Sequence, residues 1–320
     1  MSGPFRVVCV GVVTLDALAL VPRYPGPDER VIGEQVMIAG GGPAANAAVV
    51  LARQGIKAAF IGRVGKDTAG DHAIQMLEAE GVDVSGVLQD GAVATQASCV
   101  VVSKDIQTRA IATLAVPALP PIAAFGARAI ELIDGAEWVH TDHFGFASAS
   151  DYLRGRSPSR QPRLSIDAGH PVAGFTLDGL DLYIPTTEAL TRQFGLEHTP
   201  EGIEQAARLA LAGGAAAVVA TSGSQGSIAF WSERFAPGQP AGKVAVAARR
   251  DIEIVSTLGA GDVFHGGLLA ALCRGGDWAS VLLQANTTAA LSCRALDARS
   301  AIPTLSELNE MLTASPSSAV

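Results

Sequence analysis

The sequence contains few aromatic residues and no cluster of basic residues. Phe, Trp and Tyr together make up 5% of its 320 residues, and the formal net charge is −8. Arg249 and Arg250 form the only adjacent basic pair. Because a nucleic-acid-binding surface needs a basic patch, we expect no nucleic-acid partner. The hydrophobic fraction of 48% is instead typical of a globular protein with a large core.

Cysteine pairs and long apolar runs are also absent. The four cysteines are widely separated and form no Cys-x-x-Cys motif: Cys9, Cys99, Cys273 and Cys293. Because each has apolar neighbours, we predict buried, reduced thiols and neither a disulfide framework nor a zinc site. The longest apolar run, 209–221, is too short to span a bilayer, and Asp16 interrupts the apolar stretch near the start of the chain. We therefore expect a cytoplasmic protein without a membrane partner.

Apolar runs of strand length alternate with helical periodicity along most of the chain. The strand-like runs are 5–13, 58–62, 137–141, 164–167, 181–184 and 216–221. The helical runs are 44–53, 68–80, 122–134, 187–194, 200–212, 260–273, 278–293 and 304–313. Strands separated by helices form right-handed βαβ units, so the pattern predicts an α/β fold of three αβα layers with a mostly parallel central sheet.

Two parts of the chain have strand character with no helix between the strands. The paired runs are 18–21 with 31–39 and 95–103 with 108–114. They predict a small antiparallel sheet, so we expect one domain over 1–313 with lid segments inserted at about 14–39 and 95–114, followed by a disordered tail at 314–320. Edge strands carry unpaired backbone groups that often pair with another sheet. A homodimer through the lid is therefore an expectation.

Acidic residues stand at or shortly after the ends of several predicted strands. They are Asp16, Asp142, Asp167 and Glu188. Because ligands bind at the carboxyl ends of parallel strands, these residues indicate a polar site that a cation could assist. His140 and Asp142 would share one strand face, but no third cluster completes a metal site, which favours contact with a substrate for Asp142.

The strongest motif is Ser-Thr-Leu-Gly-Ala-Gly-Asp at 256–262, which opens a helical run. Unpaired N–H groups at a helix start attract phosphate, and Gly259 and Gly261 let the backbone approach an anion closely. Asp262 follows within reach of a hydroxyl that attacks the same phosphorus. An anion hole beside a carboxylate is typical of phosphoryl transfer. The residues alone leave open a glycine turn with an aspartate cap.

Two further glycine-rich segments follow strands. Residues 40–46, Gly-Gly-Gly-Pro-Ala-Ala-Asn, formally match the G-x-G-x-x-A dinucleotide fingerprint, but they follow lid strands and contain Pro43. They favour close approach of the backbone to a polyhydroxylated ligand, with Asn46 as donor and acceptor. Residues 221–226, Thr-Ser-Gly-Ser-Gln-Gly, suit the phosphates or ribose of a nucleotide, although an ordinary turn has the same composition. Neither a P-loop nor a G-x-S-x-G elbow is present, which argues against P-loop NTPases and α/β-hydrolases.

Taken together, these segments resemble the ribokinase-like (PfkB) carbohydrate kinases over nearly the whole chain. Six motifs in order carry the resemblance: Gly11-x-x-x-x-Asp16, Gly41-Gly42-x-x-x-Asn46, Gly62-Arg63-Val64-Gly65-Lys66-Asp67, Thr221-x-Gly223-x-x-Gly226, Thr257-Leu258-Gly259-Ala260-Gly261-Asp262 and Ser300-Ala301-Ile302-Pro303. The resemblance implies an ATP-dependent kinase for a small hydroxylated substrate, with magnesium arriving on ATP.

The resemblance also implies a role for each matching residue. Asp262 matches the general base, and Gly259, Ala260 and Gly261 match the anion hole. The sugar-binding positions correspond to Asp16, Gly41, Gly42 and Asn46. The nucleotide-binding positions correspond to Thr221, Gly223, Ser224, Gly226 and Asn286. Arg109 lies in the lid, where similar enzymes carry an arginine near the phosphates.

Two groups within the family look closest. Segments 9–16 and 256–262 are similar to ketohexokinases, whereas 40–45 and 261–266 are more similar to sulfofructose kinases. Both groups phosphorylate the 1-hydroxyl of a ketose, so the resemblance implies a ketose substrate. Arg30 falls near a basic position of the sulfofructose enzymes, but 142–146 lacks the arginine expected beside a sulfonate.

The chain departs from the family pattern at two places. Ser256 stands where the family usually has Asp at its monovalent-cation site, so the resemblance does not support activation by potassium. The family's N-x-x-E motif appears as Pro-Thr-Thr-Glu, ending at Glu188, and magnesium contacts are expected through water or Asp167. A nucleoside kinase and a non-catalytic sugar or nucleotide sensor of the same fold are the alternatives.

Overall fold

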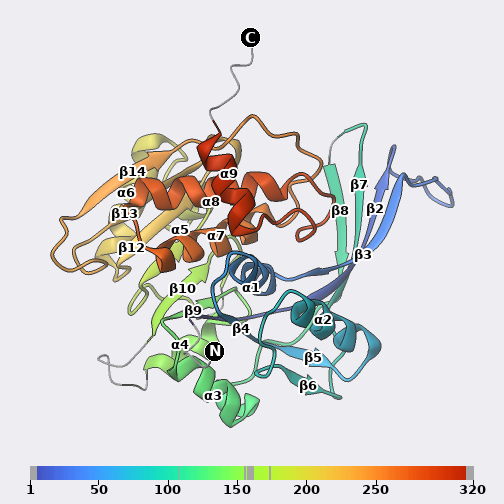
Figure 1. Cartoon of the computed structure of the whole chain (residues 1–320), viewed down its shortest axis with the longest axis horizontal. Coiled ribbons are helices and arrows are strands. Elements are labelled where there is room, and N and C mark those ends of the chain that lie inside the picture. Colours follow the sequence, from blue (N-terminus) through green and yellow to red (C-terminus); the bar gives the residue numbers. More distant parts are fainter. Residues whose placement is uncertain (1–5, 107, 155, 157–161, 173, 315–320) are drawn as a thin grey trace.

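The computed structural model describes residues 6–106, 108–154, 156, 162–172 and 174–314. Its centre is an eight-stranded sheet of order β14-β13-β12-β11-β10-β9-β1-β4 (Figure 1). Six strands are parallel: β1 (Val7–Val10), β4 (Ala58–Ile61), β9 (Trp138–Thr141), β10 (Arg163–Asp167), β11 (Leu182–Ile184) and β12 (Ala217–Thr221). The antiparallel hairpin of β13 (Ser227–Trp231) and β14 (Gly242–Val246) completes one edge. The predicted mostly parallel central sheet is confirmed.

Helices cover both faces of this sheet. One face packs against α1 (Pro43–Arg53), α2 (Thr68–Ala79), α7 (Ala260–Arg274) and α8 (Trp278–Ser292). The other face packs against α3 (Ala127–Asp134), α4 (Phe146–Arg154), α5 (Thr187–Gln193) and α6 (Pro200–Ala212). Strand side chains alternate between the two layers, so Cys9 joins the first core and Val10 the second. The three αβα layers are therefore confirmed. The last helix, α9 (Leu305–Thr313), packs on α8.

A second sheet of four strands stands at one side of the molecule (Figure 1). Its strands are β2 (Thr14–Val21), β3 (Gln35–Gly41), β7 (Ala97–Ser103) and β8 (Thr108–Thr113), in the order β3-β2-β7-β8. The two hairpins are antiparallel, but β2 and β7 pair in parallel, so the prediction of an antiparallel sheet is wrong for this central pair. The chain passes through α1 and α2 between the hairpins and enters β7 in the same direction as β2.

Several element boundaries differ from the predicted ones. The first strand ends at Val10, because the chain turns at Gly11 before β2 begins. Gly126, with φ 87, divides the predicted helix 122–134 into the 3-10 turn η1 (Ile122–Phe125) and α3. Three features were not predicted: α4, the hairpin of β13 and β14, and the pair of β5 (Arg63–Gly65) and β6 (Leu88–Asp90).

One prediction about the cysteines is wrong. Cys99 is exposed on β7, whereas Cys9, Cys273 and Cys293 are buried as expected. Apolar neighbours in a strand do not reveal which face a side chain occupies when both faces are apolar. Among the described residues no helix combines the length and the apolar character of a membrane span. Of the predicted tail, only Ala314 lies within the described residues.

Candidate active site

The first turn of α7, which we call the anion-binding corner, is the predicted position of the anion hole. Gly259 caps this helix in the left-handed conformation, with φ 72, and the amide of Ala260 is used in a turn to the Thr257 carbonyl at 3.3 Å. Within the described part of the chain, the amides of Gly261 and Asp262 have no hydrogen-bond acceptor. Unpaired amides at a helix N-terminus attract negative charge. Of the three predicted anion-hole residues, Gly259 and Gly261 thus have amides without an acceptor among the described residues, whereas the Ala260 amide is already bonded; their contact with an anion stays a prediction.

The carboxyl group of Asp262 lies beside this corner and is half-buried. Burial and the nearby Asp167 raise its pKa to about 6, while a hydrogen bond from Asn46 and the charge of His265 oppose the rise. The Asn46 Nδ2 atom donates to Asp262 Oδ2 at 2.7 Å. A carboxyl group whose pKa lies near neutral pH suits a general base, since it is ionised at working pH and still accepts a proton readily.

A small cavity of about 100 Å³ opens directly in front of Asp262. Its lining contains the predicted residues Asp16, Gly41, Gly42 and Asn46, together with Leu18, Ala39, Gly40, Leu258, Gly259, Asp297 and Ala298. We call this cavity the sugar pocket, after the ligand that the resemblance implies for its residues. The structure therefore brings the predicted sugar-binding residues of the lid and α1 together with the predicted base. The buried Asp16 Oδ1 atom has no hydrogen-bond partner within the described structure, which leaves it available to a ligand hydroxyl.

The glycine residues before α1 form a wall of the sugar pocket that has no room for larger side chains. A Cβ atom at Gly41 would lie 2.1 Å from Asp16 Oδ2, and one at Gly42 would lie 2.3 Å from the Val12 carbonyl oxygen. Gly42 also has φ 97, which favours glycine. The run ends β3, which pairs with β2, rather than following a strand of the central sheet. Its position supports the interpretation as a close backbone approach and not the dinucleotide fingerprint.

A buried arginine that the sequence analysis did not single out stands behind the sugar pocket. Arg299 donates from Nε to Asn46 Oδ1 at 2.8 Å and from Nη2 to the Gly41 carbonyl at 2.8 Å. Its backbone amide donates at 3.2 Å to Oδ2 of Asp297, which lines the pocket. The available signal was an arginine within the closing segment 298–303, whose other residues are small or apolar.

The two predicted lid arginines occupy different environments. Arg109, on β8, donates from Nη1 to Thr257 Oγ1 at 3.2 Å, which places its guanidinium next to the anion-binding corner. Arg30 lies exposed in the segment between β2 and β3, and it forms no ion pair with a described residue. The sugar pocket does not include Arg30 in its lining. A role for Arg30 at the substrate stays a prediction.

Asp142 is completely buried, and both of its oxygens hold backbone amides. It accepts hydrogen bonds from Val12 at 2.8 Å, Ala44 at 3.4 Å, Phe144 at 2.9 Å and Gly145 at 3.0 Å. Burial raises the pKa of Asp142 to about 6 although these amides favour its charged form. Its observed contacts join the loops after β1 and β9 to the start of α1. Contact with a substrate stays a prediction.

This arrangement predicts a stability effect at Asp142. We expect Asp142→Leu to lower the free energy of unfolding by at least about 3 kcal/mol, because each buried amide left without an acceptor costs about 1–3 kcal/mol. Asp142→Asn keeps one acceptor oxygen and is expected to lose about half as much. Urea unfolding at neutral pH measures both. A variant with unchanged stability and a raised KM for the sugar would show instead that Asp142 contacts the substrate.

The predicted nucleotide-binding residues lie around the end of β12. Thr221 ends this strand, and Gly223 and Ser224 lie exposed in the 3-10 turn η3 (Gly223–Gln225). Gly226 has φ 104, and a Cβ atom there would lie 2.1 Å from the Val246 carbonyl oxygen. Asn286 on α8 accepts from Ser227 Oγ at 3.0 Å and donates to the Val246 carbonyl at 3.0 Å. Asn286 thus fixes the hairpin that adjoins the exposed loop.

The two predicted magnesium contacts lie in different surroundings. Asp167 is buried, and its Oδ2 atom lies 3.2 Å from His265 Nδ1. Burial by itself would raise the pKa of Asp167, but the charge and the hydrogen bond of His265 hold this pKa below its usual range. Glu188 has a side chain that is 60% exposed and lies 3.8 Å from His198. No group of three or more acidic, histidine or cysteine side chains among the described residues could hold a metal by itself. The exposed carboxylate of Glu188 is free to contact a hydrated ion, whereas the Asp167 carboxylate already contacts His265, and both magnesium contacts stay predictions.

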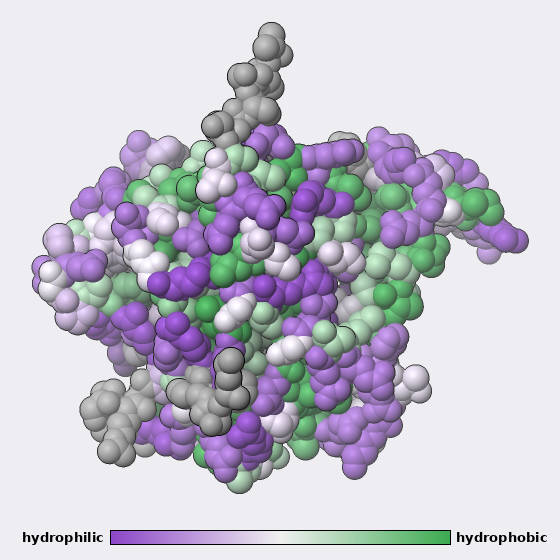
Figure 2. Space-filling model, in the orientation of Figure 1, coloured by the Kyte–Doolittle hydropathy of each residue, from purple (hydrophilic) through white to green (hydrophobic). Residues whose placement is uncertain are grey.

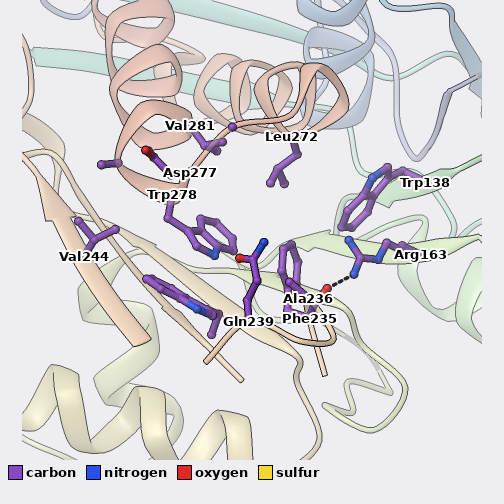
Figure 3. A pocket seen from close by; sticks show the side chains of 13 residues that line it. Trp138, Arg163, Phe235, Ala236, Gln239, Val244, Leu272, Asp277, Trp278 and Val281 are labelled. Carbon is purple, nitrogen blue, oxygen red and sulfur yellow. Dashed lines mark hydrogen bonds between the residues drawn. The ribbon is translucent and has the colours of Figure 1, made fainter. Parts of the chain in front are cut away.

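An apolar cavity of about 430 Å³ lies at the opposite end of the central sheet (Figure 3). Trp138 and Arg163, the first residues of β9 and β10, line it together with Trp231, Phe235 and Trp278. All three tryptophans of the chain therefore surround this cavity, and none lines the sugar pocket. Intrinsic tryptophan fluorescence accordingly reports on the far end of the molecule and not directly on Asp262.

Comparison with known proteins identifies the family. The model of the pfkB family carbohydrate kinases matches residues 5–305. The ribokinase of Bacillus subtilis (strain 168) is 25% identical over 311 residues, covering 96% of this chain and 100% of that protein. The ketohexokinase of Mus musculus is 25% identical over 280 residues, covering 84% and 90%. The structure of Arabidopsis thaliana ribokinase complexed with ribose and ATP has a TM-score of 0.82 at 23% identity, covering 98% and 100%.

The chain belongs to the PfkB family of carbohydrate kinases, and its fold is ribokinase-like. It is accordingly a phosphotransferase that acts on a sugar or a nucleoside. The family expected from the six sequence motifs is confirmed.

Proposed function

We propose that this protein is an ATP-dependent kinase that phosphorylates a hydroxyl group of a ketose. The observation that supports the proposal most strongly is that a carboxyl group, an anion site and a polar cavity lie next to one another. The Asp262 carboxyl group, the unpaired amides at the start of α7 and the polar sugar pocket adjoin one another. A base, an anion site and a pocket for a hydroxylated molecule are what phosphoryl transfer to an alcohol requires.

In the proposed reaction, the sugar lies in the pocket with its accepting hydroxyl directed at Asp262. As the sugar oxygen forms its bond to the γ-phosphorus, the hydroxyl proton passes to the Asp262 carboxylate. The bond between the γ-phosphorus and the bridging oxygen breaks, and ADP leaves with that electron pair. The amides of Gly261 and Asp262 face the negative charge on the transferring group, and Arg109 adds a positive charge from the lid. Asp262 then releases the proton to water.

The proposed ATP site is the exposed loop that follows β12. Thr221, Gly223 and Ser224 offer hydroxyl and amide groups there, and Asn286 holds the adjoining hairpin in place. The relative from Arabidopsis thaliana is a ribokinase whose structure contains ribose and ATP, which supports ATP as the phosphoryl donor. Magnesium bound to the ATP phosphates supplies further charge neutralisation when present. Glu188 is the exposed carboxylate that would contact its hydration shell.

The walls of the sugar pocket favour a sugar over a nucleoside. Its lining contains aspartate, asparagine and glycine backbone, and it contains no aromatic side chain. A nucleobase binds best between aromatic or extended apolar walls, whereas paired carboxylates and amides suit vicinal hydroxyls. The similarity to a ketohexokinase supports a ketose within the sugars.

The experiment that tests this proposal measures ADP release from Mg-ATP with a panel of acceptors. The panel contains fructose, tagatose, psicose, sorbose, sulfofructose, ribose and adenosine. We expect one ketose to have the highest kcat/KM. Turnover of adenosine above every sugar would identify a nucleoside kinase, and ATP binding without ADP release on any acceptor would favour a sensor.

We further propose that two copies of the chain associate through the lid. The inner face of the lid carries Asp16 and Leu18, and the alternate residues form its outer face. In register across the four strands, this outer face consists of Ile38, Ala17, Cys99, Ala112, Val36, Ala19, Val101 and Ala110. It carries no charged side chain, and Val36 is 74% exposed. Figure 2 shows hydrophobic residues on the lid surface. An apolar face of this kind indicates a protein interface.

Substitution on the outer face tests this association. We expect Val36→Glu to convert a dimer into a monomer, because it places a charge in the apolar contact. Gln35→Glu is the matched control, since it adds the same charge one residue away on the other face of β3. Light scattering at micromolar protein measures both masses. A monomeric mass for the unmodified protein would contradict the proposed dimer.

A further inference from the structure

Arg299 fixes which way round the side-chain amide of Asn46 lies. The guanidinium contains donors and no acceptor, so the Asn46 atom that faces Arg299 Nε at 2.8 Å must be the carbonyl oxygen Oδ1. The NH₂ group of Asn46 is then directed at Asp262, where Nδ2 lies 2.7 Å from Oδ2. The orientation of one amide is therefore determined by a residue that stands behind it.

The opposite orientation would have a different effect on the base. If the Asn46 amide were rotated by half a turn, its carbonyl oxygen would face Asp262. Two oxygens at that distance repel unless the carboxyl group carries a proton, so the rotated amide favours the protonated acid. The observed amide donates a hydrogen bond and favours the carboxylate. The base is useful for phosphoryl transfer only as the carboxylate, because only that form accepts the hydroxyl proton.

We propose that Arg299 is a positioning residue that keeps Asp262 ionised by fixing the orientation of the Asn46 amide. The inference rests on the proposed role of Asp262 as the base of a kinase. Arg299 itself does not reach the substrate, because it is 5% exposed and lies behind the residues that line the sugar pocket. Its Nη2 atom also donates to the Gly41 carbonyl at 2.8 Å, which fixes the adjoining pocket wall from the same side chain.

The surroundings of Arg299 are consistent with a permanently charged and immobile donor. Burial lowers the pKa of Arg299 to about 10, which still leaves it protonated at neutral pH. Its own backbone carbonyl accepts a hydrogen bond from Arg53 Nη1 at 2.8 Å, and Arg53 pairs with Glu80. The closing segment is thereby tied to α1, which also carries Asn46. A Cβ atom at Gly40 would lie 2.2 Å from Arg299 Nη1, so the glycine run leaves the room that this guanidinium occupies.

Other charged groups also act on Asp262 and must be kept constant in a test. Asp167 at the end of β10 and Asp142 after β9 raise its pKa, and His265 on α7 lowers it. None of these side chains forms a hydrogen bond with Arg299 within the described structure. A substitution at Arg299 therefore changes the orientation of Asn46 and also removes the positive charge of Arg299, which itself interacts with Asp262, while these contacts remain in place.

The first experiment compares the pH dependence of kcat for the unmodified protein with Arg299→Met and Arg299→Lys. For the unmodified protein we expect kcat to fall below pH about 6, following protonation of Asp262. We expect Arg299→Met to move this acid limb up by about one pH unit, with a roughly fivefold loss at pH 6 that approaches about tenfold at lower pH and disappears at high pH. Arg299→Lys keeps a donor-only group and is expected to restore most of the difference. An equal loss at every pH would overturn the proposal.

Arg53→Met is the matched control. It removes an arginine that holds the same closing segment but does not touch Asn46. We expect this variant to lower the melting temperature and leave the acid limb in place. If Arg53→Met moved the acid limb as far as Arg299→Met, the effect would come from loosening of the segment, and the proposal would be wrong.

A second measurement needs no substrate and separates this proposal from the kinase proposal. The ¹³Cγ signal of Asp262, identified by its loss in Asp262→Asn, is titrated by NMR in the unmodified protein and in Arg299→Met. We expect its pKa to be about one unit higher in the variant. The side-chain NH₂ signal of Asn46 in the unmodified protein is expected to shift with the same pKa as Asp262. This titration needs only the unmodified protein, so it can be measured even if Arg299→Met does not fold. An Asn46 signal that is independent of pH would refute the inference, whereas absence of ADP release on all acceptors would refute the kinase alone.

Discussion

Asp262→Asn is expected to lower kcat by at least ~10²-fold while the dissociation constant for ATP stays within about twofold of its original value. Removal of a general base typically costs about 10²–10⁴-fold in rate. The asparagine side chain has nearly the same shape and keeps the half-buried position at the start of α7, but it cannot accept the hydroxyl proton. A coupled assay of ADP release gives kcat, and calorimetry gives the affinity for ATP.

The control for this substitution is Asp277→Asn. Asp277 caps α8 by accepting from the Ser280 amide at 2.8 Å and lies beside the tryptophan-lined cavity, at the other end of the sheet. Asparagine is an equally good helix cap, so both stability and kcat are expected to stay unchanged. Turnover by Asp262→Asn close to that of the control would remove Asp262 from the role of base.

The two glycines of the anion-binding corner are expected to respond in opposite ways to alanine. Gly259 has φ 72, and a Cβ atom there would lie 2.3 Å from the Cβ atom of Ala298. Gly259→Ala is therefore expected to lower the free energy of unfolding by about 1–3 kcal/mol, because it combines a strained backbone with a steric clash. Gly261 is helical, and a Cβ atom there meets nothing within 4 Å. Gly261→Ala is expected to keep or slightly raise stability.

Activity distinguishes the same pair. The free space around Gly261 is where a phosphate would approach the unpaired amides, so a methyl group there is expected to lower kcat/KM for ATP by about 10²-fold, as misplacement of a reacting group does. Urea unfolding and initial rates at varied ATP measure both properties. If Gly261→Ala were fully active, phosphate would have to bind elsewhere than at the start of α7.

Much of the site was predictable because short motifs encode it locally. The glycines and Asp262 at the start of α7 lie within a few residues of one another, and their side-chain and backbone requirements are visible in the sequence. The run Gly41-Gly42 with Asn46 likewise combines a strand end, a tight approach and a helix start. The sheet order could also be anticipated in outline, since alternating strands and helices allow few arrangements.

The contacts that join these motifs were not predictable from local patterns. Arg299 reaches Asn46 across 253 positions of the chain, and no periodicity or spacing connects them. The parallel pairing of β2 with β7 has the same origin, because the intervening helices decide the direction in which the chain returns to the lid. Asp142 resembled a ligand contact in the sequence, yet its oxygens are directed at backbone amides, which only the fold places around it.

The measurement that tests the central claim most directly is the stoichiometry of ADP and sugar phosphate formed from Mg-ATP and the best ketose, with the unmodified protein and Asp262→Asn run side by side. The account predicts one phosphorylated ketose for each ADP released by the unmodified protein and almost none by the variant. ADP release without a phosphorylated sugar, or equal product from both proteins, would contradict it.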